Sequence, residues 1–515
     1  MTTTSNLAPD PAASEHGATS PGALRPGVCV AGYLRGELGT GEHGRLVLAA
    51  VREASLEAGS LIFTETGSRQ EYPFEAQGAT DLNVNLVVVN ADQMLNFAAT
   101  VGPQFFRGRY TIGVWAWELE ELPDRWPEAF ALTDEIWTNS EYSRRAVATL
   151  TDRPVYAFPP PIVTPPVTLA LDRRDLGLPE GFLFLFCFDF LSVTQRKNPQ
   201  GLVQAFSDAF APGEGPFLVI KAINGAHRTS DLASLRRMAG SRRDILILDG
   251  YLAYDRHAAL MNSCDCYVSL HRSEGFGLTM AEAMALGKPV IATGYSGNLD
   301  FMDTETAYLV AWTEATVPDG CYPYPSGARW AEPDIHAAAR ALRHIYEHHA
   351  EAAAVGDRAR LAVAARHGLS SRVPFIQERF RHAQEVLAKR SERHEEANRM
   401  AIPAPKDAAS RAGEDVTKPV PYPATPGVVG RGSPSGLDTL SLAQALTDTE
   451  VANRRVIGLT HRLVDALREQ RTLREEIAEL RDEVARMQHE RDALRGSRAL
   501  QLAERYVGLR RRLRR

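Results

Sequence analysis

The feature that most constrains this chain is a repeated alternation of short apolar runs with longer segments of helical spacing. Short apolar runs bounded by turn residues are typical of buried strands. We expect strands at residues 28–31, 84–89, 110–114 and 135–139, and again at 182–188, 217–222, 245–248, 266–270, 289–293 and 307–310. Strands that alternate with helices predict an α/β fold built from parallel sheets.

A proline-rich stretch separates the two sets of strands. Residues 158–166 contain five prolines, which neither a helix interior nor a central strand tolerates. A chain of 515 residues also exceeds the size at which one hydrophobic core stops growing. We therefore predict a disordered segment at 1–25 and two Rossmann-like domains, at 26–165 and 170–398. Their sheets should face a ligand cleft with their carboxyl ends.

The last part of the chain has a different character. Residues 401–440 are rich in proline, glycine, alanine and serine, which predicts a flexible linker. From Val456 to Leu494, heptad positions recur at alternating spacings of three and four, the pattern of a coiled coil. We expect a coiled coil at 441–496 and a homo-oligomer formed through it. A single amphipathic helix docked on the rest of the chain is the alternative.

The extreme end of the chain is strongly basic. Five of the last six residues are arginine, on a segment whose apolar residues share one helical face. A basic amphipathic tail at 497–515 suits the surface of an anionic membrane. The alternative is a frayed helix end whose charge serves solubility.

Composition narrows the compartment and the partners. The net charge is −6, which argues against nucleic acid as a partner. The first 25 residues lack the apolar region of a signal peptide, and the apolar runs are too short to predict a membrane-spanning helix. We therefore predict a cytoplasmic protein. It would be peripheral at the inner face of the plasma membrane if the tail binds there. The five cysteines have irregular spacings and predict buried free thiols rather than a metal site.

The segment 269–289 carries the most informative motif. An expected strand ends there, a Gly-x-Gly loop follows, and a helix begins near Leu278. Backbone N–H groups of such a loop and of the helix N-terminus can hold a diphosphate. Glu274 and Glu282 lie on either side of the loop, and carboxylates suit sugar and ribose hydroxyls because they accept two hydrogen bonds.

Two glutamates separated by seven residues, here Glu274 and Glu282, form a pattern that resembles the signature of the family 4 retaining glycosyltransferases. This family is also called group 1 and has the two-Rossmann GT-B fold. The resemblance covers about residues 28–398. It implies that Glu282 binds the donor ribose and that Glu274 contacts the donor sugar. Backbone groups of the loop would hold the sugar and the diphosphate, at Gly275, Phe276, Gly277 and Leu278.

The family also places cations beside the leaving diphosphate. Lys197 matches the lysine of this motif, whereas Ser192 stands where the arginine is expected. Arg196 is the candidate substitute, and a solvated helix start is the alternative for both basic residues. In the first domain, Gly39 and Gly41 belong to a glycine-bearing loop that in this family approaches the donor phosphates.

The family's first-domain histidine has no counterpart in the segment 111–123. Trp117 and Glu118 occupy roughly its place. Exposed indole rings beside a carboxylate would suit a sugar, and we include Glu118 among the catalytic candidates with Glu274 and Lys197. In the alternative interpretation, both Trp115 and Trp117 belong to the core. A loop at 321–334 is a candidate cap over the site.

We therefore expect a retaining, metal-independent glycosyltransferase that needs no cofactor. It would use a nucleotide sugar as co-substrate and a saccharide or lipid-linked acceptor, in the synthesis of cell-surface polysaccharide or glycoconjugates. Two alternatives remain open: a nucleotide-sugar epimerase of the same architecture, and a non-catalytic scaffold that assembles other proteins through its coiled coil.

Overall fold

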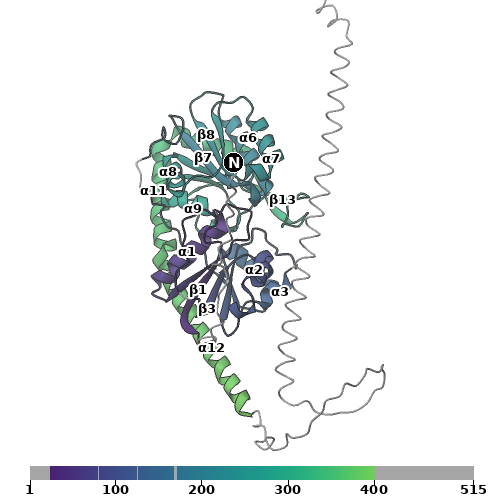
Figure 1. The fold of residues 1–515 in the computed structure, drawn as a ribbon. Coiled ribbons are helices and arrows are strands. Elements are labelled where there is room, and N and C mark those ends of the chain that lie inside the picture. The colour runs from purple at the N-terminus through teal and green to yellow at the C-terminus, as the bar shows by residue number, and fades with distance from the viewer. Residues whose placement is uncertain (1–23, 79, 125, 167–170, 401–515) are drawn as a thin grey trace, which may run out of the picture. The chain divides into compact units, whose positions relative to one another are not determined.

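The computed structural model describes residues 24–78, 80–124, 126–166 and 171–400. Within them lie two parallel sheets with six strands each, arranged end to end (Figure 1). Helices cover both faces of each sheet, and this α/β arrangement of two Rossmann-like domains is the predicted GT-B fold. Because both faces are covered, a central strand such as β3 is buried along its whole length.

The first sheet has the strand order β2-β1-β3-β4-β5-β6. Its strands are β1 (Arg25–Gly32), β2 (Ala58–Ile62), β3 (Leu82–Val88), β4 (Tyr110–Trp115), β5 (Glu135–Thr138) and β6 (Val155–Ala157). Its helices are α1 (Gly39–Glu53), α2 (Met94–Val101), α3 (Pro127–Ala131) and α4 (Glu141–Ala148). The expected strands are all present, but the short edge strands β2 and β6 were not predicted.

The second sheet has the order β12-β11-β10-β7-β8-β9. Its strands are β7 (Leu183–Asp189), β8 (Phe217–Ile223), β9 (Ile245–Asp249), β10 (Cys266–Ser269), β11 (Val290–Thr293) and β12 (Tyr308–Val310). Its helices are α5 (Thr194–Lys197), α6 (Pro199–Ala209), α7 (Thr229–Ala239), α8 (Tyr254–Ser263), α9 (Leu278–Ala285), α10 (Ile335–Glu347) and α11 (His349–His367).

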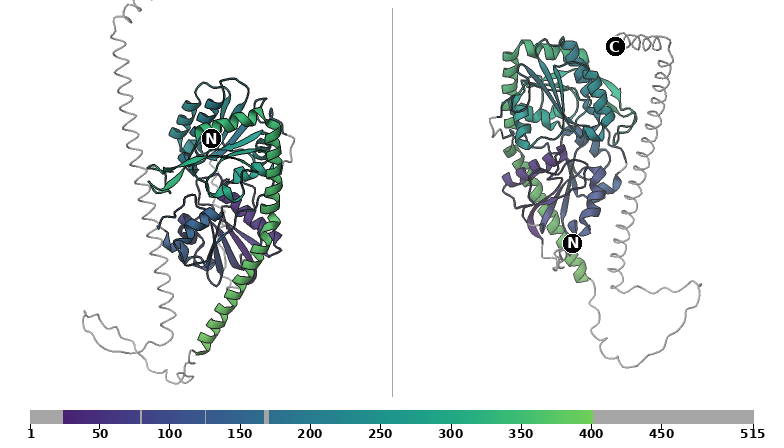
Figure 2. Two further views of the ribbon diagram at one scale, coloured as in Figure 1. Left: turned by 180° about the vertical axis from the view of Figure 1, so that it is seen from behind. Right: turned by 45° about the horizontal axis from the view of Figure 1, so that its top comes forward.

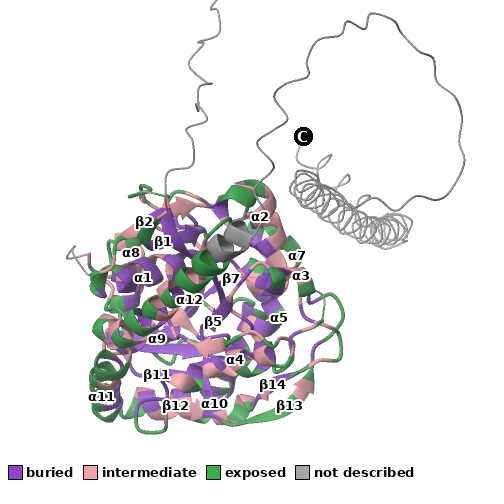
Figure 3. Ribbon diagram, turned by 90° about the horizontal axis from the view of Figure 1, so that it is seen from below, coloured by how far each residue is buried: buried purple, intermediate pink, exposed green. Residues whose placement is uncertain are grey.

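The helix α12 (Val373–Met400) leaves the second domain and packs on the first (Figure 2). Ile376 and Ala383 are buried in the same apolar cluster as Val28 and Trp137 of the first sheet. The helix also contacts α1, beside which it is seen in Figure 3. The range 170–398 predicted for the second domain therefore ends differently in the structure, because the apolar side of α12 is buried by the first domain.

A two-stranded antiparallel hairpin extends from the second domain. It consists of β13 (Trp312–Thr316) and β14 (Arg329–Pro333), with the segment 317–328 at its tip. The tip packs into an apolar cluster of the first domain through Val317, Cys321 and Tyr324. The sequence had indicated only a long capping loop at 321–334. In the structure, the hairpin connects the two domains through the packing of its tip.

Several expectations concern the parts of the chain outside the described residues. The predicted N-terminal segment up to residue 23, the linker, the coiled coil and the basic tail all lie there. Among the described residues, none of the helices is long and apolar enough to cross a membrane. The five cysteines are buried and free, as expected.

Candidate active site

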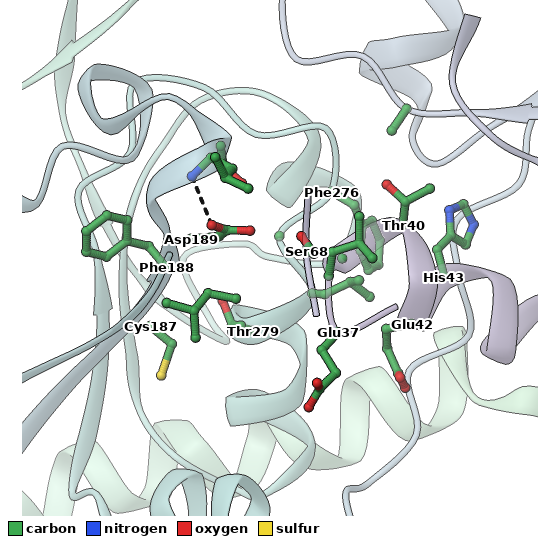
Figure 4. A pocket seen from close by; sticks show the side chains of 18 of the residues that line it. Glu37, Thr40, Glu42, His43, Ser68, Cys187, Phe188, Asp189, Phe276 and Thr279 are labelled. Carbon is green, nitrogen blue, oxygen red and sulfur yellow. Dashed lines mark hydrogen bonds between the residues drawn. The ribbon is translucent and has the colours of Figure 1, made fainter. Parts of the chain in front are cut away.

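A cavity of about 490 Å³ lies between the carboxyl ends of the two sheets. That size is typical of small-molecule sites. In the first domain, its lining comes from segments that follow all six strands. In the second domain, it comes from the ends of β7 and β8 and from segments that follow β7, β9 and β10. Figure 4 shows side chains around this cavity, with Asp189 and Thr279 of the second domain to the left of Glu37, Thr40 and Glu42 of the first. We refer to it as the main cleft.

Glu274 is at the centre of a buried charge cluster in the main cleft. Lys197 Nζ lies 2.5 Å from Glu274 Oε1, and Arg196 donates a hydrogen bond of 3.1 Å to Oε2. Burial alone would raise the pKa of Glu274, but the charges of Lys197 and Arg196 outweigh it and lower this pKa to about 2. Glu274 is therefore ionised at neutral pH. Burial lowers the pKa of Lys197, and the charge of Glu274 opposes this shift. With both basic side chains protonated, the three groups carry one more positive than negative charge.

The backbone explains why Arg196 and Lys197 reach Glu274. The turn α5 begins after Val193 and ends at Asn198, both with positive φ. Asn198 Nδ2 then donates a hydrogen bond of 2.9 Å to Leu270 O at the end of β10. This bond ties α5 to the strand that precedes the glutamate motif. Arg196 is only 4% exposed, so the alternative of a solvated helix start does not hold for it.

Glu282 lies in α9 and lines the same cleft. Burial raises its pKa to about 8, and the charge of Glu42 adds to this shift while Arg45 opposes it. Glu42 in turn pairs with Arg45, whose Nε donates to Glu42 Oε2 at 2.9 Å. A carboxyl group with this pKa is mostly protonated at pH 7, and it needs little free energy to ionise when hydrogen-bond donors bind to it.

The loop between the two glutamates is closely packed. Gly277 has a φ of +98° and lies directly before α9. A Cβ atom on Gly297 would lie 2.0 Å from Gly275 O, and a Cβ atom on Gly275 would lie 2.8 Å from Asn139 Nδ2 of the first domain. Phe276 points its ring into the core, 4.7 Å from that of Phe301. The loop therefore presents backbone to the cleft, and the helix N-terminus follows it.

The glycines of the first domain divide into two roles. Gly39 lines the main cleft, and nothing lies within 4 Å of a Cβ atom placed on it. Gly41 is not among the lining residues, and a Cβ atom there would lie 2.4 Å from Gly36 O. Both glycines were expected in a loop, but helix α1 begins at Gly39, so Gly41 serves the close packing of its first turn.

Glu118 lines the main cleft, as expected, but the neighbouring tryptophans do not. Trp115 and Trp117 are 1% and 5% exposed, so the alternative of core tryptophans is correct. Glu118 Oε2 accepts a hydrogen bond of 2.9 Å from the hydroxyl of Tyr324. The sequence offered no sign of this pair, because 206 residues separate its members.

Other lining residues were also missed by sequence reasoning. Lys221, Tyr251 and His257 come from β8, the loop after β9 and α8. Lys221 Nζ donates to Ala222 O at 2.8 Å, and burial lowers its pKa. Lys221 lies near the end of an expected strand and Tyr251 shortly after another, a position that could have marked these two as candidates. His257 lies inside α8, where no such signal exists.

His271 is buried and belongs to the framework of the site. Its Nδ1 lies 3.0 Å from Ser269 Oγ, and its Nε2 lies 3.2 Å from Asn298 Oδ1. Burial lowers its pKa, so the ring is neutral at pH 7. His271 thereby holds the segment before Glu274 against the turn that contains Asn298.

These features define a two-domain protein of the GT-B type with a cleft at the domain boundary, lined by Arg196, Lys197 and Glu274. Residues 173–316 match the family model of the glycosyl transferases group 1. The match contains Arg196, Lys197, Glu274 and Glu282.

Two curated relatives each match a part of the chain. An α-monoglucosyldiacylglycerol synthase of Streptococcus pneumoniae is 32% identical over 131 residues, which are 25% of this chain and 28% of the relative. An uncharacterized glycosyltransferase of Methanocaldococcus jannaschii is 32% identical over 100 residues, 18% of this chain and 28% of the relative. The matched region thus spans little more than a quarter of each relative's length.

Solved structures confirm the fold over a larger region. A sucrose-phosphate synthase of Thermosynechococcus elongatus superimposes with a TM-score of 0.52 at 15% identity, covering 70% of this chain and 100% of the other. HepE of Anabaena in complex with UDP-glucose gives a TM-score of 0.51 at 15% identity, covering 69% and 100%.

Proposed function

We propose that this protein is a retaining glycosyltransferase that moves a sugar from a nucleotide-sugar donor to a saccharide or lipid-linked acceptor without a metal ion. The donor would lie in the main cleft, with its ribose at Glu282 and its sugar at Glu274. The alternative of a nucleotide-sugar epimerase predicts a different product from the same cleft, and product analysis separates the two.

The buried cluster of Arg196, Lys197 and Glu274 is the observation that carries this proposal. Its excess positive charge lies beside the loop Gly275–Gly277 and the N-terminus of α9. Preorganised cations and backbone N–H groups stabilise a diphosphate that gains charge as it leaves. A chain with such a cluster does not need a metal ion to neutralise the leaving group, and this supports the metal-independent mechanism.

The reaction would proceed on one face of the donor sugar. The acceptor oxygen forms a bond to the anomeric carbon while the bond from that carbon to the diphosphate oxygen breaks. The acceptor proton passes to the departing phosphate oxygen on the same face, and Lys197 stabilises the charge on the diphosphate. Attack and departure on one face retain the configuration of the anomeric carbon.

The names of the relatives indicate which substrates to test first. The Streptococcus pneumoniae relative is named for a glucosylated diacylglycerol, which supports a lipid-linked sugar as acceptor class. HepE was crystallised with UDP-glucose, so UDP-sugars are the first donors to examine. A role in cell-surface glycoconjugate synthesis, at the inner face of the membrane, follows from this acceptor class.

The experiment that tests the proposal measures thermal unfolding in the presence of nucleoside diphosphates and their sugars. A ligand at 100 times its dissociation constant should add about 2.7 kcal/mol to the free energy of unfolding. We expect one nucleotide to raise the melting temperature of the wild-type protein, and much less that of Glu282→Ala. Unchanged melting with every nucleotide would reject the proposal and favour the scaffold.

A further inference from the structure

A second cavity of about 180 Å³ adjoins the main cleft on its first-domain side. The two cavities have lining residues in common, among them Asn90, Glu118 and Arg196. The second cavity also has lining residues that the main cleft lacks, among them Asp92, Trp117, Trp126 and Tyr324. Because Arg196 also pairs with Glu274, anything bound in the second cavity lies next to the expected position of the donor sugar.

The hairpin closes this cavity. Pro323 and Tyr324 at its tip belong to the lining, and Tyr324 is only 7% exposed. The Tyr324 ring packs 5.4 Å from that of Trp117, and its hydroxyl donates to Glu118 Oε2 at 2.9 Å. Arg329, which pairs with Thr316 at the end of the ladder next to the tip, forms an ion pair of 3.0 Å with Glu120 of the first domain.

The lining has the chemistry of a site for a neutral sugar. Asp92 and Glu118 offer carboxyl oxygens to hydroxyl donors, and Asn90 is held in place because its Oδ1 accepts from Ala116 N at 2.8 Å. Burial raises the pKa of Asp92, and the charge of Glu118 adds to this shift. The partly buried ring of Trp126 supplies apolar surface for C–H groups, and Trp117, although part of the core, also borders the cavity. Arg196, the cation of this lining, is already paired with Glu274. The two remaining charged groups are acidic and disfavour an anionic acceptor such as a phosphate.

The size of the cavity limits what enters it. Whole small-molecule ligands occupy pockets of roughly 300–1,000 Å³, so a cavity of about 180 Å³ holds one unit of a larger molecule. One sugar ring is such a unit. An internal ring of a polysaccharide carries substituents at both ends and does not fit a site closed by the hairpin, so only a terminal ring can enter.

We propose that the second cavity binds the terminal, uncharged sugar ring of the acceptor, and that Tyr324 is a positioning residue that holds Glu118 for this binding. This inference rests on the proposed function and narrows it. It predicts transfer to the end of a neutral saccharide, free or lipid-linked, and not to a lipid phosphate. The hairpin thus makes acceptor choice a property of the second domain as well as of the first.

The test uses the full chain with methyl α- and β-hexosides as probes, observed by saturation-transfer NMR in the presence of saturating UDP. Tyr324→Phe removes only the hydroxyl that reaches Glu118, and Asp92→Asn changes the facing carboxyl. Tyr308→Phe is the matched control, because the Tyr308 hydroxyl is buried without a hydrogen-bond partner among the described residues. UDP affinity is measured on the same samples by calorimetry.

We expect Tyr324→Phe and Asp92→Asn to weaken hexoside binding about tenfold, the usual loss for a hydrogen bond to a charged group, with unchanged UDP affinity. With an active hexoside, the KM for this acceptor should rise and the KM for the donor should not. Tyr308→Phe should match the wild type. If the wild-type protein binds UDP but none of the hexosides, this inference is overturned and the proposed function stands. Loss of UDP binding by the wild type would instead reject the proposed function.

Discussion

Lys197 Nζ donates a hydrogen bond of 2.5 Å to Glu274 Oε1, although the two residues lie 77 positions apart in the chain. This contact joins the two sequence motifs that we had identified separately, one after β7 and one after β10. Both strands are neighbours in the second sheet, so their following loops meet at its carboxyl edge. The pair is the structural basis of the first prediction.

Replacing Lys197 should lower turnover far more than donor binding. We expect Lys197→Met to reduce kcat by about 10²- to 10³-fold, because one preorganised donor to a developing anion is lost. Steady-state kinetics with the identified donor measure this change. Lys389→Met, at an exposed position of α12, is the control and should be neutral. An equal loss in both variants would contradict the assigned role.

The pKa of Glu282 predicts how donor binding depends on pH. This pKa is about 8, whereas an ordinary glutamate titrates near 4.3. Ribose hydroxyls donate to the ionised form, so nucleotide affinity should rise as the pH passes through 8, by about fivefold between pH 7 and pH 8. Calorimetric titrations across this range measure the slope.

The control for this pH dependence is Glu282→Gln. The phosphates of the nucleotide still titrate in this experiment, but the Glu282 carboxyl group is gone. Its affinity should be lower at pH 8.5 and should lack the added rise between pH 7 and pH 8. The folded protein binds the Glu282 proton more tightly than the unfolded chain does. The contribution of this group to stability is therefore full below pH 4 and is lost as the pH rises through 8. If nucleotide affinity changes with pH in parallel for the wild type and for Glu282→Gln, Glu282 does not bind the ribose.

Helix α12 should contribute to stability through one buried ion pair. Arg379 donates from Nε to Glu135 Oε1 at 3.2 Å, and Glu135 is fully buried in β5. Arg379→Leu leaves this carboxylate without its cation and should lower the free energy of unfolding by about 3–5 kcal/mol. Urea unfolding followed by circular dichroism measures this loss.

Arg390 on the same helix offers the matched control. It pairs with Asp134, but its side chain is 49% exposed. Arg390→Leu should change the free energy of unfolding by about 1 kcal/mol or less, because exposed ion pairs contribute little. Similar losses in the two variants would show that the helix, and not the buried pair, determines the effect.

Gly297 should be intolerant of any side chain. A Cβ atom there would lie 2.0 Å from Gly275 O, which is backbone and cannot rotate away. Gly297→Ala should displace the loop that follows Glu274 and weaken nucleotide binding at least tenfold. Gly67→Ala is the control, because the nearest atom to its Cβ position is 3.6 Å away. Equal affinities of the two variants, measured by calorimetry, would refute the steric argument.

The amino-acid sequence by itself determined the repeating strands and helices, the boundary near the prolines and the spacing of Glu274 and Glu282. These are local properties, because a strand or a helix is encoded by the periodicity of a few consecutive residues. The Gly-x-Gly loop was predictable for the same reason. Its neighbours along the chain are also its neighbours in space.

The tertiary structure decided everything that depends on distant segments meeting. The return of α12 to the first domain, the burial of Trp117 and the bond between Tyr324 and Glu118 each join residues that no local pattern connects. Their positions follow from packing, in which apolar surfaces of one domain cover those of the other and buried polar groups must find partners. The proposed donor site is built mainly on motifs of consecutive residues, whereas the proposed acceptor site is visible only in the folded chain.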